Sequence, residues 1–381
     1  MDRNIFEADH DTYRDSVRTF LGKEVVPRYD AWERAGIVPR ELFTQAAELG
    51  VFAAVPEQYG GAGVKDFRYN AIFTEESAYA GVMPAALGPG LQADICMPYL
   101  LDLTNDEQKT RWLPGVASGE TVTAIAMTEP GTGSDLSGIR TRAVREGDYY
   151  VVNGAKSFIT NGIRADLVIT AVRTGDHLHK GLSLLVVERD TTGFERGRNL
   201  EKVGMHAQDT AELSFVDARV PAANLLGEEG TGFFALTGNL PQERVSIAVY
   251  AVAHATAALR WTIDYVRQRK AFGQPIGALQ AIRFRLAELV TEVEITQQYV
   301  DRCIFELNAG TLTAVDAAKA KLWSTELQGR VVDACVQLHG GYGYMLEYPI
   351  ARAYADARIS WIYGGTSEIM KEIVGRSLQL A

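Results

Sequence analysis

An octapeptide rich in glycine and hydroxyl side chains, residues 128–135, has the composition of a ligand-binding loop. It follows an apolar run over residues 121–127 that predicts a buried strand. Its two glycines, two positions apart, allow the backbone to turn tightly and to approach a ligand closely. Its two threonines and its serine can donate or accept hydrogen bonds. Such a loop after a strand can hold a flat polar ring and its phosphates, and an ordinary surface turn is the alternative.

Two common nucleotide-binding motifs do not fit this loop. A dinucleotide fingerprint requires a third glycine three residues after the second, and Leu136 stands there. A phosphate loop requires Gly-Lys followed by Ser or Thr after the spacer residues, and that run occurs nowhere in the chain. The ligand is therefore expected to be held in another way.

Together with four further segments in matching order and spacing, this loop resembles the acyl-CoA dehydrogenase family over essentially the whole chain. The four segments are residues 158–162, 269–273, 337–341 and 363–366. The resemblance implies an FAD-dependent enzyme that forms a trans α,β double bond in a medium- or long-chain acyl-CoA thioester. In that reaction a base takes the α-proton while a hydride leaves the β-carbon for the flavin, on the opposite face of the acyl chain.

Hydrophobic periodicity independently divides the chain into three parts and predicts an α+β fold class. Helical spacing fills the first third, short strand-like runs fill the middle, and helical spacing returns near Thr231. The resembled family has the same order. The predicted domains are an N-terminal all-α domain over residues 1–120, a middle β-barrel-like domain over 121–230 and a C-terminal four-helix bundle domain over 231–381.

Local signals predict where several elements begin and end. A helix with Val17 and Val25 on its apolar face is expected to end at Pro27, and a second helix is expected over residues 39–49. The pair Asn153-Gly154, between two apolar runs, predicts a tight hairpin turn. Further strands are expected over residues 167–172, 182–187 and 213–216, and a buried helix over 245–259.

Composition narrows the class of protein. Hydrophobic residues make up 47 % and charged residues 23 %, as is usual for globular chains, so disorder is not indicated. The net charge of −10 argues against a nucleic-acid partner. Residues 1–11 are polar and acidic, which predicts no signal peptide, and the longest nearly uncharged apolar stretch is too short to span a bilayer. Three widely spaced cysteines fit a reducing compartment, expected to be the cytoplasm, or the mitochondrial matrix for a processed eukaryotic chain.

The reaction requires a carboxylate base whose pKa is raised by desolvation from about 4.3 toward neutrality. Most members of the resembled family carry this base directly after the tyrosine of the 363–366 segment. Here Gly364 stands at that position and cannot accept a proton, so the chain is either inactive or takes its base from elsewhere. The resemblance implies that the Gly364 backbone N–H still polarises the thioester oxygen, and a glycine needed only for turn geometry is the alternative.

Glu243 is the predicted base. The segment around it, residues 240–244, is similar to that of the long-chain and isovaleryl members, which carry their base on this helix. Pro241 is expected at the first position of the helix, so an acid favoured there by the helix dipole alone is the alternative. That dipole would also lower the pKa of Glu243, and burial would have to oppose it. Arg244, ~100° around the helix, is interpreted as part of a structural ion pair, with substrate binding as the alternative.

The resemblance implies a flavin site shared by two subunits of a homotetramer or dimer of dimers. One subunit supplies Ile125, Met127, Thr128, Gly133, Ser134, Phe158, Ile159 and Thr160. Its neighbour contacts the adenosine part through Arg269, Phe272, Gln280, Gln337, Gly340 and Gly341. The remaining expected contacts are Thr366 and Glu368 near the pyrophosphate and adenosine, and Ser134, Pro241, Arg244 and Gly365 at the substrate. Core packing of Phe158 and a solvated charge pair at Arg269 are the alternatives.

Two other functions stay open at this point. An oxidase or monooxygenase on the same scaffold would use oxygen in place of the expected electron-transfer flavoprotein, and a catalytically silent acyl-CoA-binding homologue would need no base. No metal is expected, because the histidines form no pair at helical ligand spacing. The floor of the acyl pocket is expected within residues 87–97, where Gly88 and Gly90 leave room.

Overall fold

The computed structural model describes residues 3–380, and helices form its first part. These are α1 (Ala8–Phe20), α2 (Tyr29–Ala35), α3 (Glu41–Glu48), α4 (Phe67–Tyr79), α5 (Met83–Leu91), α6 (Met97–Leu103) and α7 (Asp106–Ser118). The second predicted helix is confirmed as α3. The predicted end at Pro27 is wrong, because the chain continues through short helical turns, η1 (Leu21–Val25) and η2 (Val26–Arg28), into α2. Pro27 lies in the first turn of η2, where its missing N–H is tolerated.

A mixed eight-stranded sheet forms the second part of the described chain. Its strands are β1 (Thr123–Ala126), β2 (Arg142–Glu146), β3 (Tyr149–Thr160), β4 (Leu167–Arg173), β5 (Leu182–Glu188), β6 (Phe194–Asn199), β7 (Thr210–Pro221) and β8 (Leu225–Leu226). The strand order is β6-β7-β3-β2-β4-β5-β8, with β1 parallel beside β4. The strands predicted from apolar runs are confirmed as β1, β4, β5 and β7.

The predicted hairpin turn at Asn153-Gly154 is wrong. Strand β3 runs through both residues, and its pairing with β7 shifts register between Val152 and Gly154. A Cβ atom on Gly154 would lie 2.7 Å from the Thr141 Cα atom, so this glycine permits a close approach of two strands. The Asn-Gly pair therefore forms a bulge inside a strand, which is a second use of a glycine in a β pattern.

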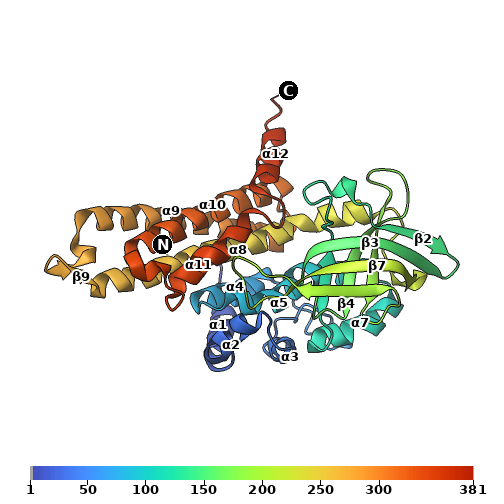
Figure 1. Cartoon of the computed structure of the whole chain (residues 1–381), viewed down its shortest axis with the longest axis horizontal. Coiled ribbons are helices and arrows are strands. Elements are labelled where there is room, and N and C mark those ends of the chain that lie inside the picture. The colour runs from blue at the N-terminus through green and yellow to red at the C-terminus, as the bar shows by residue number, and fades with distance from the viewer. Residues whose placement is uncertain (1–2, 381) are drawn as a thin grey trace.

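Helices return in the third part and confirm the predicted α+β order. They are α8 (Gly232–Gln268), α9 (Gln280–Asn308), α10 (Ala314–His339), α11 (Pro349–Ala357) and α12 (Ser367–Ser377), with the small strands β9 (Lys270–Ala271) and β10 (Gln274–Pro275) after α8. Helix α8 extends from the β domain to the far end of the bundle (Figure 1). Within residues 3–380, no helix combines the length and the apolar character needed to cross a bilayer.

The position predicted for Pro241 is wrong, because α8 begins at Gly232 and Pro241 lies inside it. A proline inside a helix leaves the carbonyl four residues earlier without its usual donor. That carbonyl belongs to Thr237, and both Thr237 and Gly238 are exposed, so water can serve in place of the missing donor. The apolar run that follows, residues 245–259, is buried as predicted.

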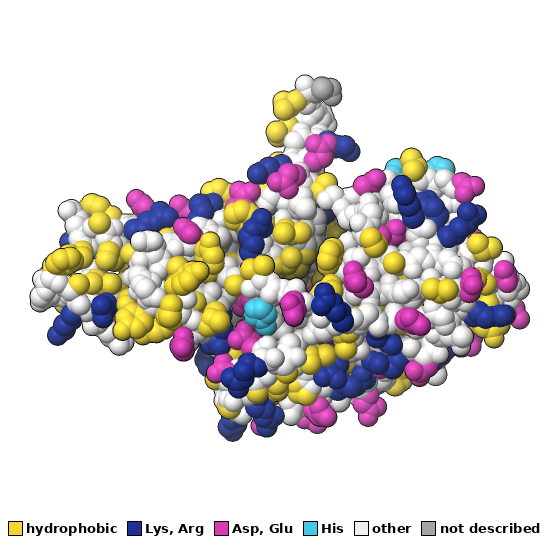
Figure 2. Space-filling model, in the orientation of Figure 1, with side chains coloured by type: hydrophobic (Ala, Val, Ile, Leu, Met, Phe, Trp, Pro, Cys, Tyr) yellow, Lys and Arg dark blue, Asp and Glu magenta, His cyan; other side chains and the backbone are white. Residues whose placement is uncertain are grey.

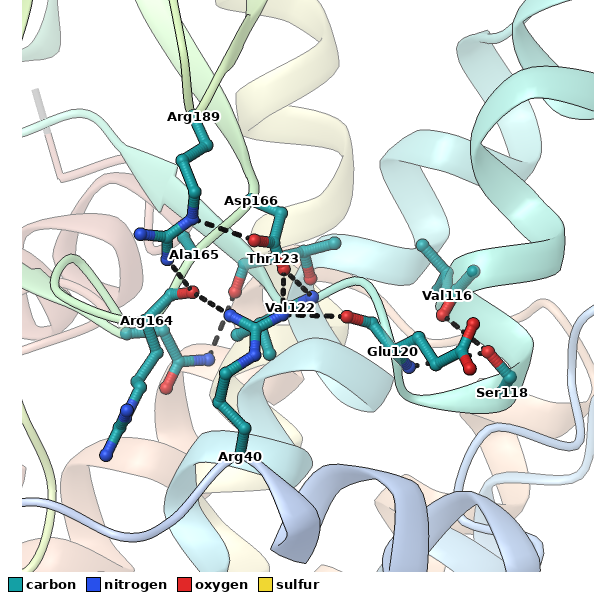
Figure 3. Close-up of polar contacts among 12 residues, drawn as sticks. Arg40, Val116, Ser118, Glu120, Val122, Thr123, Arg164, Ala165, Asp166 and Arg189 are labelled. Atoms are coloured by element: carbon teal, nitrogen blue, oxygen red, sulfur yellow. Dashed lines mark hydrogen bonds and ion pairs between the residues drawn. The ribbon is translucent and has the colours of Figure 1, made fainter.

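A polar cluster ties the start of β4 to the N-terminal helices and fixes the position of β1 (Figure 3). The carboxylate of Asp166 accepts from the Arg40 guanidinium at 2.5 Å, from the Arg189 Nε–H at 2.9 Å and from the Val122 N–H at 2.9 Å. Partial burial tends to raise the pKa of Asp166, but these donors outweigh it and hold the pKa below its usual value. Because Val122 directly precedes β1, the cluster sets where the loop after β1 begins.

We expect Asp166→Asn to lower the free energy of unfolding by about 1–2 kcal/mol, since a charge-assisted hydrogen-bond network is lost. The folded-state pKa is depressed, so the contribution of Asp166 is present above its unfolded pKa and is lost as the pH falls through the folded value. Thermal unfolding of wild type and variant from pH 7 down to pH 3 measures this. Asp264→Asn, which breaks an exposed pair with Arg267, is the control, and an equal effect of both substitutions would contradict the assignment.

Candidate active site on helix α8

Glu243 lies in the interior of α8 and is only 3 % exposed. The Tyr99 phenol of α6 donates a hydrogen bond of 3.0 Å to its Oε1 atom. Burial raises the pKa of Glu243 to about 7, and the Tyr99 hydrogen bond and the charge of Arg244 partly oppose this rise. A carboxylate with a pKa near neutrality can take up a proton and release it again at physiological pH.

The conflict expected between the helix dipole and the base does not arise. The dipole acts within the first turn of a helix, and ~3 turns of α8 precede Glu243. The alternative that Glu243 is only a favourable N-terminal acid is therefore wrong. Desolvation, the largest influence on its pKa, acts without that opposition.

The glycine loop before α12 lies against the same face of α8. Gly364 and Gly365 have φ angles of 64° and 94°, which side chains rarely adopt. A Cβ atom on Gly364 would lie 2.3 Å from the Cδ1 atom of Ile247, one helical turn after Glu243. Helix α8 thus brings the carboxylate and the loop together. At the position that carries the base in most of the resembled family, a side chain would require a strained positive φ angle and a shift of the Ile247 side chain.

Two cations hold the carbonyl groups of this loop. Arg244 Nε donates to the Gly364 oxygen at 3.5 Å, and the buried Lys321 ammonium donates to the Gly365 oxygen. Within residues 3–380 Arg244 forms no ion pair, so that interpretation is wrong. Burial and the Arg244 charge lower the pKa of Lys321 to about 8. With its carbonyls fixed, the loop leaves the Gly364 N–H without a partner in the described chain, as a donor for a substrate oxygen requires.

A buried ion pair anchors the predicted ligand loop after β1 to strand β3. Lys156 of β3, which is 0 % exposed, donates to the Met127 carbonyl at 3.0 Å and to Glu129 Oε1 at 2.9 Å. The Glu129 carboxylate also accepts the backbone N–H groups of Arg140 and Thr141 at 2.7 and 2.8 Å. Burial lowers the pKa of Lys156 to about 8 and Glu129 opposes this. The pair fixes the loop backbone on the buried side, and the other side of the loop is exposed to solvent.

The open side of the loop fits a flavin. The hydroxyls of Thr128, Ser134 and Thr160 make no hydrogen bond to any described residue, so they are available to a ligand. Phe158 has a φ angle of 62° and is 68 % exposed, a strained conformation that leaves an aromatic ring for a planar partner. The Ser157 N–H donates to the Thr128 carbonyl at 2.9 Å, which joins the loop to β3. The structure thus brings Ile125, Met127, Thr128, Gly133, Ser134, Phe158, Ile159 and Thr160 into one region.

The residues expected to contact a neighbour's flavin lie at the opposite end of the molecule, beside β9 (Figure 1). A cavity of about 540 Å³ is lined there by Arg269, Gln337, Gly340 and Gly341. The Arg269 guanidinium lies 5.7 Å from the ring centroid of Tyr342. Phe272 and Gln280 are exposed nearby in sequence. One chain does not bring this group and the β1 loop together.

Thr366 and Glu368 lie at the start of α12, directly after the glycine loop. The Thr366 side chain caps the helix by accepting the Ile369 N–H at 3.4 Å, and Glu368 is exposed. Backbone and Thr366 hydrogen bonds lower the pKa of Glu368. An ionised side chain there faces solvent and does not line the glycine loop.

The sequence alone did not reveal Tyr99, Lys321 or the Lys156–Glu129 pair as parts of the site. Lys321 could have been found, because it continues a helical face whose other members, Ala317 and Ala320, are small and buried. Tyr99 carries no such signal, since its partner lies 144 residues away. The room expected at Gly88 is absent, because a Cβ atom there would lie 2.8 Å from Asn161 Oδ1.

Three family models match consecutive parts of the chain. The acyl-CoA dehydrogenase N-terminal, middle and C-terminal domain models match residues 7–120, 124–218 and 230–379. A curated relative, the mitochondrial long-chain specific acyl-CoA dehydrogenase of Rattus norvegicus, is 46 % identical over 382 residues, which cover 99 % of this chain and 88 % of the relative.

Solved structures agree with these matches. An acyl-CoA dehydrogenase from Geobacillus kaustophilus has a TM-score of 0.97 and 49 % identity, and the match covers 100 % of both chains. A chain of a structure described as the electron transferring flavoprotein of Acidaminococcus fermentans has a TM-score of 0.94 and 33 % identity, again over 100 % of both chains.

We expect Glu243→Gln to stabilise the protein at pH 8 and to change its stability little at pH 5. The folded pKa of about 7 lies above the ordinary value of about 4.3 for a glutamate, so the unfolded state ionises first and folding stability falls as the pH rises through this window. The glutamine cannot ionise, so the variant keeps the folding stability that wild type loses at high pH, up to about 3 kcal/mol. Thermal unfolding at both pH values measures it, with Glu292→Gln, which breaks an ion pair between α9 and Arg330 of α10, as control. An equal change in unfolding stability at both pH values would contradict the raised pKa of Glu243.

We expect Lys156→Met to weaken FAD binding at least tenfold, since the loop carbonyl and Glu129 lose their shared donor and the remaining buried carboxylate is unpaired. Fluorescence titration of deflavinated protein with FAD measures the dissociation constant. Lys202→Met, which removes a partly buried lysine that donates to the Gln208 carbonyl, is the matched control. Unchanged FAD affinity in Lys156→Met would show that the ion pair does not position the loop.

Proposed function

The chain belongs to the acyl-CoA dehydrogenase family, and from this premise we propose that Glu243 is the base that removes the α-proton of the acyl thioester. The chain is an FAD-dependent oxidoreductase that acts on the CH–CH bond of acyl-CoA substrates, as the sequence predicted. The observation that carries the proposal is a fully enclosed carboxylate with a pKa near neutrality, set one helical turn from the glycine loop. A carboxylate whose pKa is strongly raised by desolvation marks a candidate functional site.

The residues around Glu243 divide the reaction between them. In the ionised form, the carboxylate takes the proton from the α-carbon and becomes neutral, which suits its buried position. The Gly364 N–H donates to the thioester oxygen, where negative charge develops as the proton leaves. Arg244 and Lys321 hold the loop carbonyls and add positive charge beside the same region. FAD, when bound, accepts the hydride that leaves the β-carbon.

We further propose that Ser134, Pro241, Arg244 and Gly365 border the substrate. Pro241 and Arg244 flank the base on α8, and Gly365 follows the proposed oxygen-binding glycine. Ser134 lies in the loop proposed to bind the flavin, and its hydroxyl is free among the described residues. These positions surround the thioester end of an acyl-CoA and leave the acyl tail to the N-terminal helices.

The flavin site is proposed to require a second copy of the chain. The loop after β1 and Phe158 form one half, and the cavity beside β9 forms the other half at the far end of the molecule. Apolar side chains gather over that end (Figure 2), where Phe272, Tyr344 and Leu346 are 91 %, 83 % and 67 % exposed. A large exposed apolar patch is typical of an interface. A homotetramer, or dimer of dimers, would cover it and complete the site.

The acyl chain and the electron acceptor are proposed from the relatives. The rat relative is named for long-chain substrates, and Gly90 leaves space beside it, because a Cβ atom there would meet nothing within 4 Å. An electron-transfer flavoprotein is the proposed acceptor, supported by the likeness to a chain of the Acidaminococcus fermentans structure. Three buried free cysteines fit a reducing compartment, the cytoplasm or the mitochondrial matrix.

We expect Glu243→Gln to slow reduction of the bound flavin by palmitoyl-CoA by about 10²–10⁴-fold, since the general base is lost. Anaerobic stopped-flow bleaching of the holoenzyme measures the rate, and octanoyl-CoA tests the chain-length proposal in the same assay. Glu292→Gln should bleach at the wild-type rate, and all three proteins should carry the same FAD content. Equal bleaching rates in Glu243→Gln and wild type would exclude Glu243 as the base.

A further inference from the structure

Tyr99 is a fully buried tyrosine whose hydroxyl donates a hydrogen bond to Glu243, the proposed base. It is 0 % exposed, and its phenol donates to Glu243 Oε1 at 3.0 Å. The other carboxylate oxygen, Oε2, has no hydrogen-bond partner within residues 3–380. Burial, followed by the neighbouring Glu243 charge, raises the pKa of Tyr99, so the phenol keeps its proton throughout the working pH range. Tyr99 is thus a permanent donor to one oxygen of the base.

The helix that carries Tyr99 is itself fastened to α8. A π-helical turn, η4 (Gln92–Cys96), directly precedes α6. Its Asp94 carboxylate accepts from the Ser246 hydroxyl, and the Asp94 carbonyl accepts from Gln242 Nε2 at 2.7 Å. Gln242 and Ser246 lie one turn apart on α8 and bracket Glu243. These contacts fix the separation of α6 and α8, so the Tyr99 hydroxyl and the base have a constant relative position.

We propose that Tyr99 is the positioning residue of the base: its phenol holds Oε1 of Glu243 and thereby directs Oε2 at the α-carbon of the substrate. The inference rests on the proposed role of Glu243. In the step itself the Oε2 atom forms the new O–H bond, the α-carbon gives up the proton, and the Tyr99 O–H bond stays intact. The same hydrogen bond favours the ionised carboxylate, so it increases the fraction of molecules able to react below neutral pH.

The other groups that face Glu243 do not provide this control. Cys96 of η4 is buried, which raises the pKa of its thiol to about 12, so it stays neutral. Arg244 is the next residue of α8 and stays charged. Lys321 of α10 faces Arg244, and its pKa of about 8 confines its titration to the alkaline side. Asp94 of η4 also titrates in this range, because burial raises its pKa to about 6. Its carboxylate accepts from Ser246 and Asn70 and does not contact Glu243, so Tyr99 is the group whose hydrogen bond acts directly on the charge of Glu243 between pH 5.5 and 7.5.

The test measures the proton step apart from flavin reduction. A 3-thia-acyl-CoA carries sulfur in place of the β-carbon, so only exchange of its α-hydrogens with D₂O can occur, and NMR follows the exchange on the holoenzyme from pH 5.5 to 7.5. We expect Tyr99→Phe to move the pH of half-maximal exchange upward by about one unit, so that exchange at pH 6 falls about tenfold. The rate at the alkaline plateau should change far less.

Tyr150→Phe is the matched control, because Tyr150 is also fully buried and donates to a carboxylate, Glu229, at 2.6 Å in the β domain. It should leave the midpoint unchanged. If Tyr99→Phe folds poorly, 3-fluorotyrosine placed at position 99 is a nearly isosteric second variant. Its stronger donor should move the midpoint downward.

The outcomes separate the two proposals. A midpoint that does not move in either Tyr99 variant, with exchange slowed equally at every pH, would overturn the role of Tyr99 and leave Glu243 as the base. Exchange that persists at the wild-type rate in Glu243→Gln would instead overturn the proposed base. An upward shift in Tyr99→Phe together with loss of exchange in Glu243→Gln is the result expected from both.

Discussion

Burial of one carboxylate inside a long helix is the constraint on which the active site depends. Glu243 lies ~3 turns into α8, where neither solvent nor the helix terminus stabilises its charge. Desolvation therefore moves its pKa to about 7, and a group that would be inert as an exposed surface acid becomes a proton acceptor at neutral pH. The same desolvation costs folding stability, so the position has a functional meaning that packing alone does not explain.

Helix α8 also organises the parts that act with the base. Its Ile247 side chain closes the space beside Gly364, and Arg244 holds the loop carbonyl. At its distal end the helix leads into Arg269, beside the second proposed flavin surface. A continuous helix of 37 residues thus fixes the distance between two sites that a short element could not span. The length of α8 accounts for the distance between the two proposed halves of the flavin site.

The order of the domains and the main strands could be predicted from the sequence because hydrophobic periodicity is a local property. The proposed base could also be singled out from the sequence, since Gly364 and Glu243 occur together in one chain. Positions that depend on tertiary contacts could not. Pro241 has the sequence signal of a helix start, but α8 already begins at Gly232. Asn153-Gly154 has the signal of a hairpin turn, but the glycine serves a close contact with Thr141. Tyr99 gives no sequence signal, because its partner is 144 residues away.

The most direct test of the central claim is a crystal structure of the FAD-loaded protein with a 3-thia-acyl-CoA. We expect Glu243 Oε2 to lie about 3–3.5 Å from the α-carbon, a distance suited to reaction, with Oε1 still bound to the Tyr99 hydroxyl. We also expect the Gly364 N–H within hydrogen-bonding distance of the thioester oxygen. A thioester bound elsewhere, or another carboxylate nearer the α-carbon than Glu243, would contradict the role of Glu243 as the base.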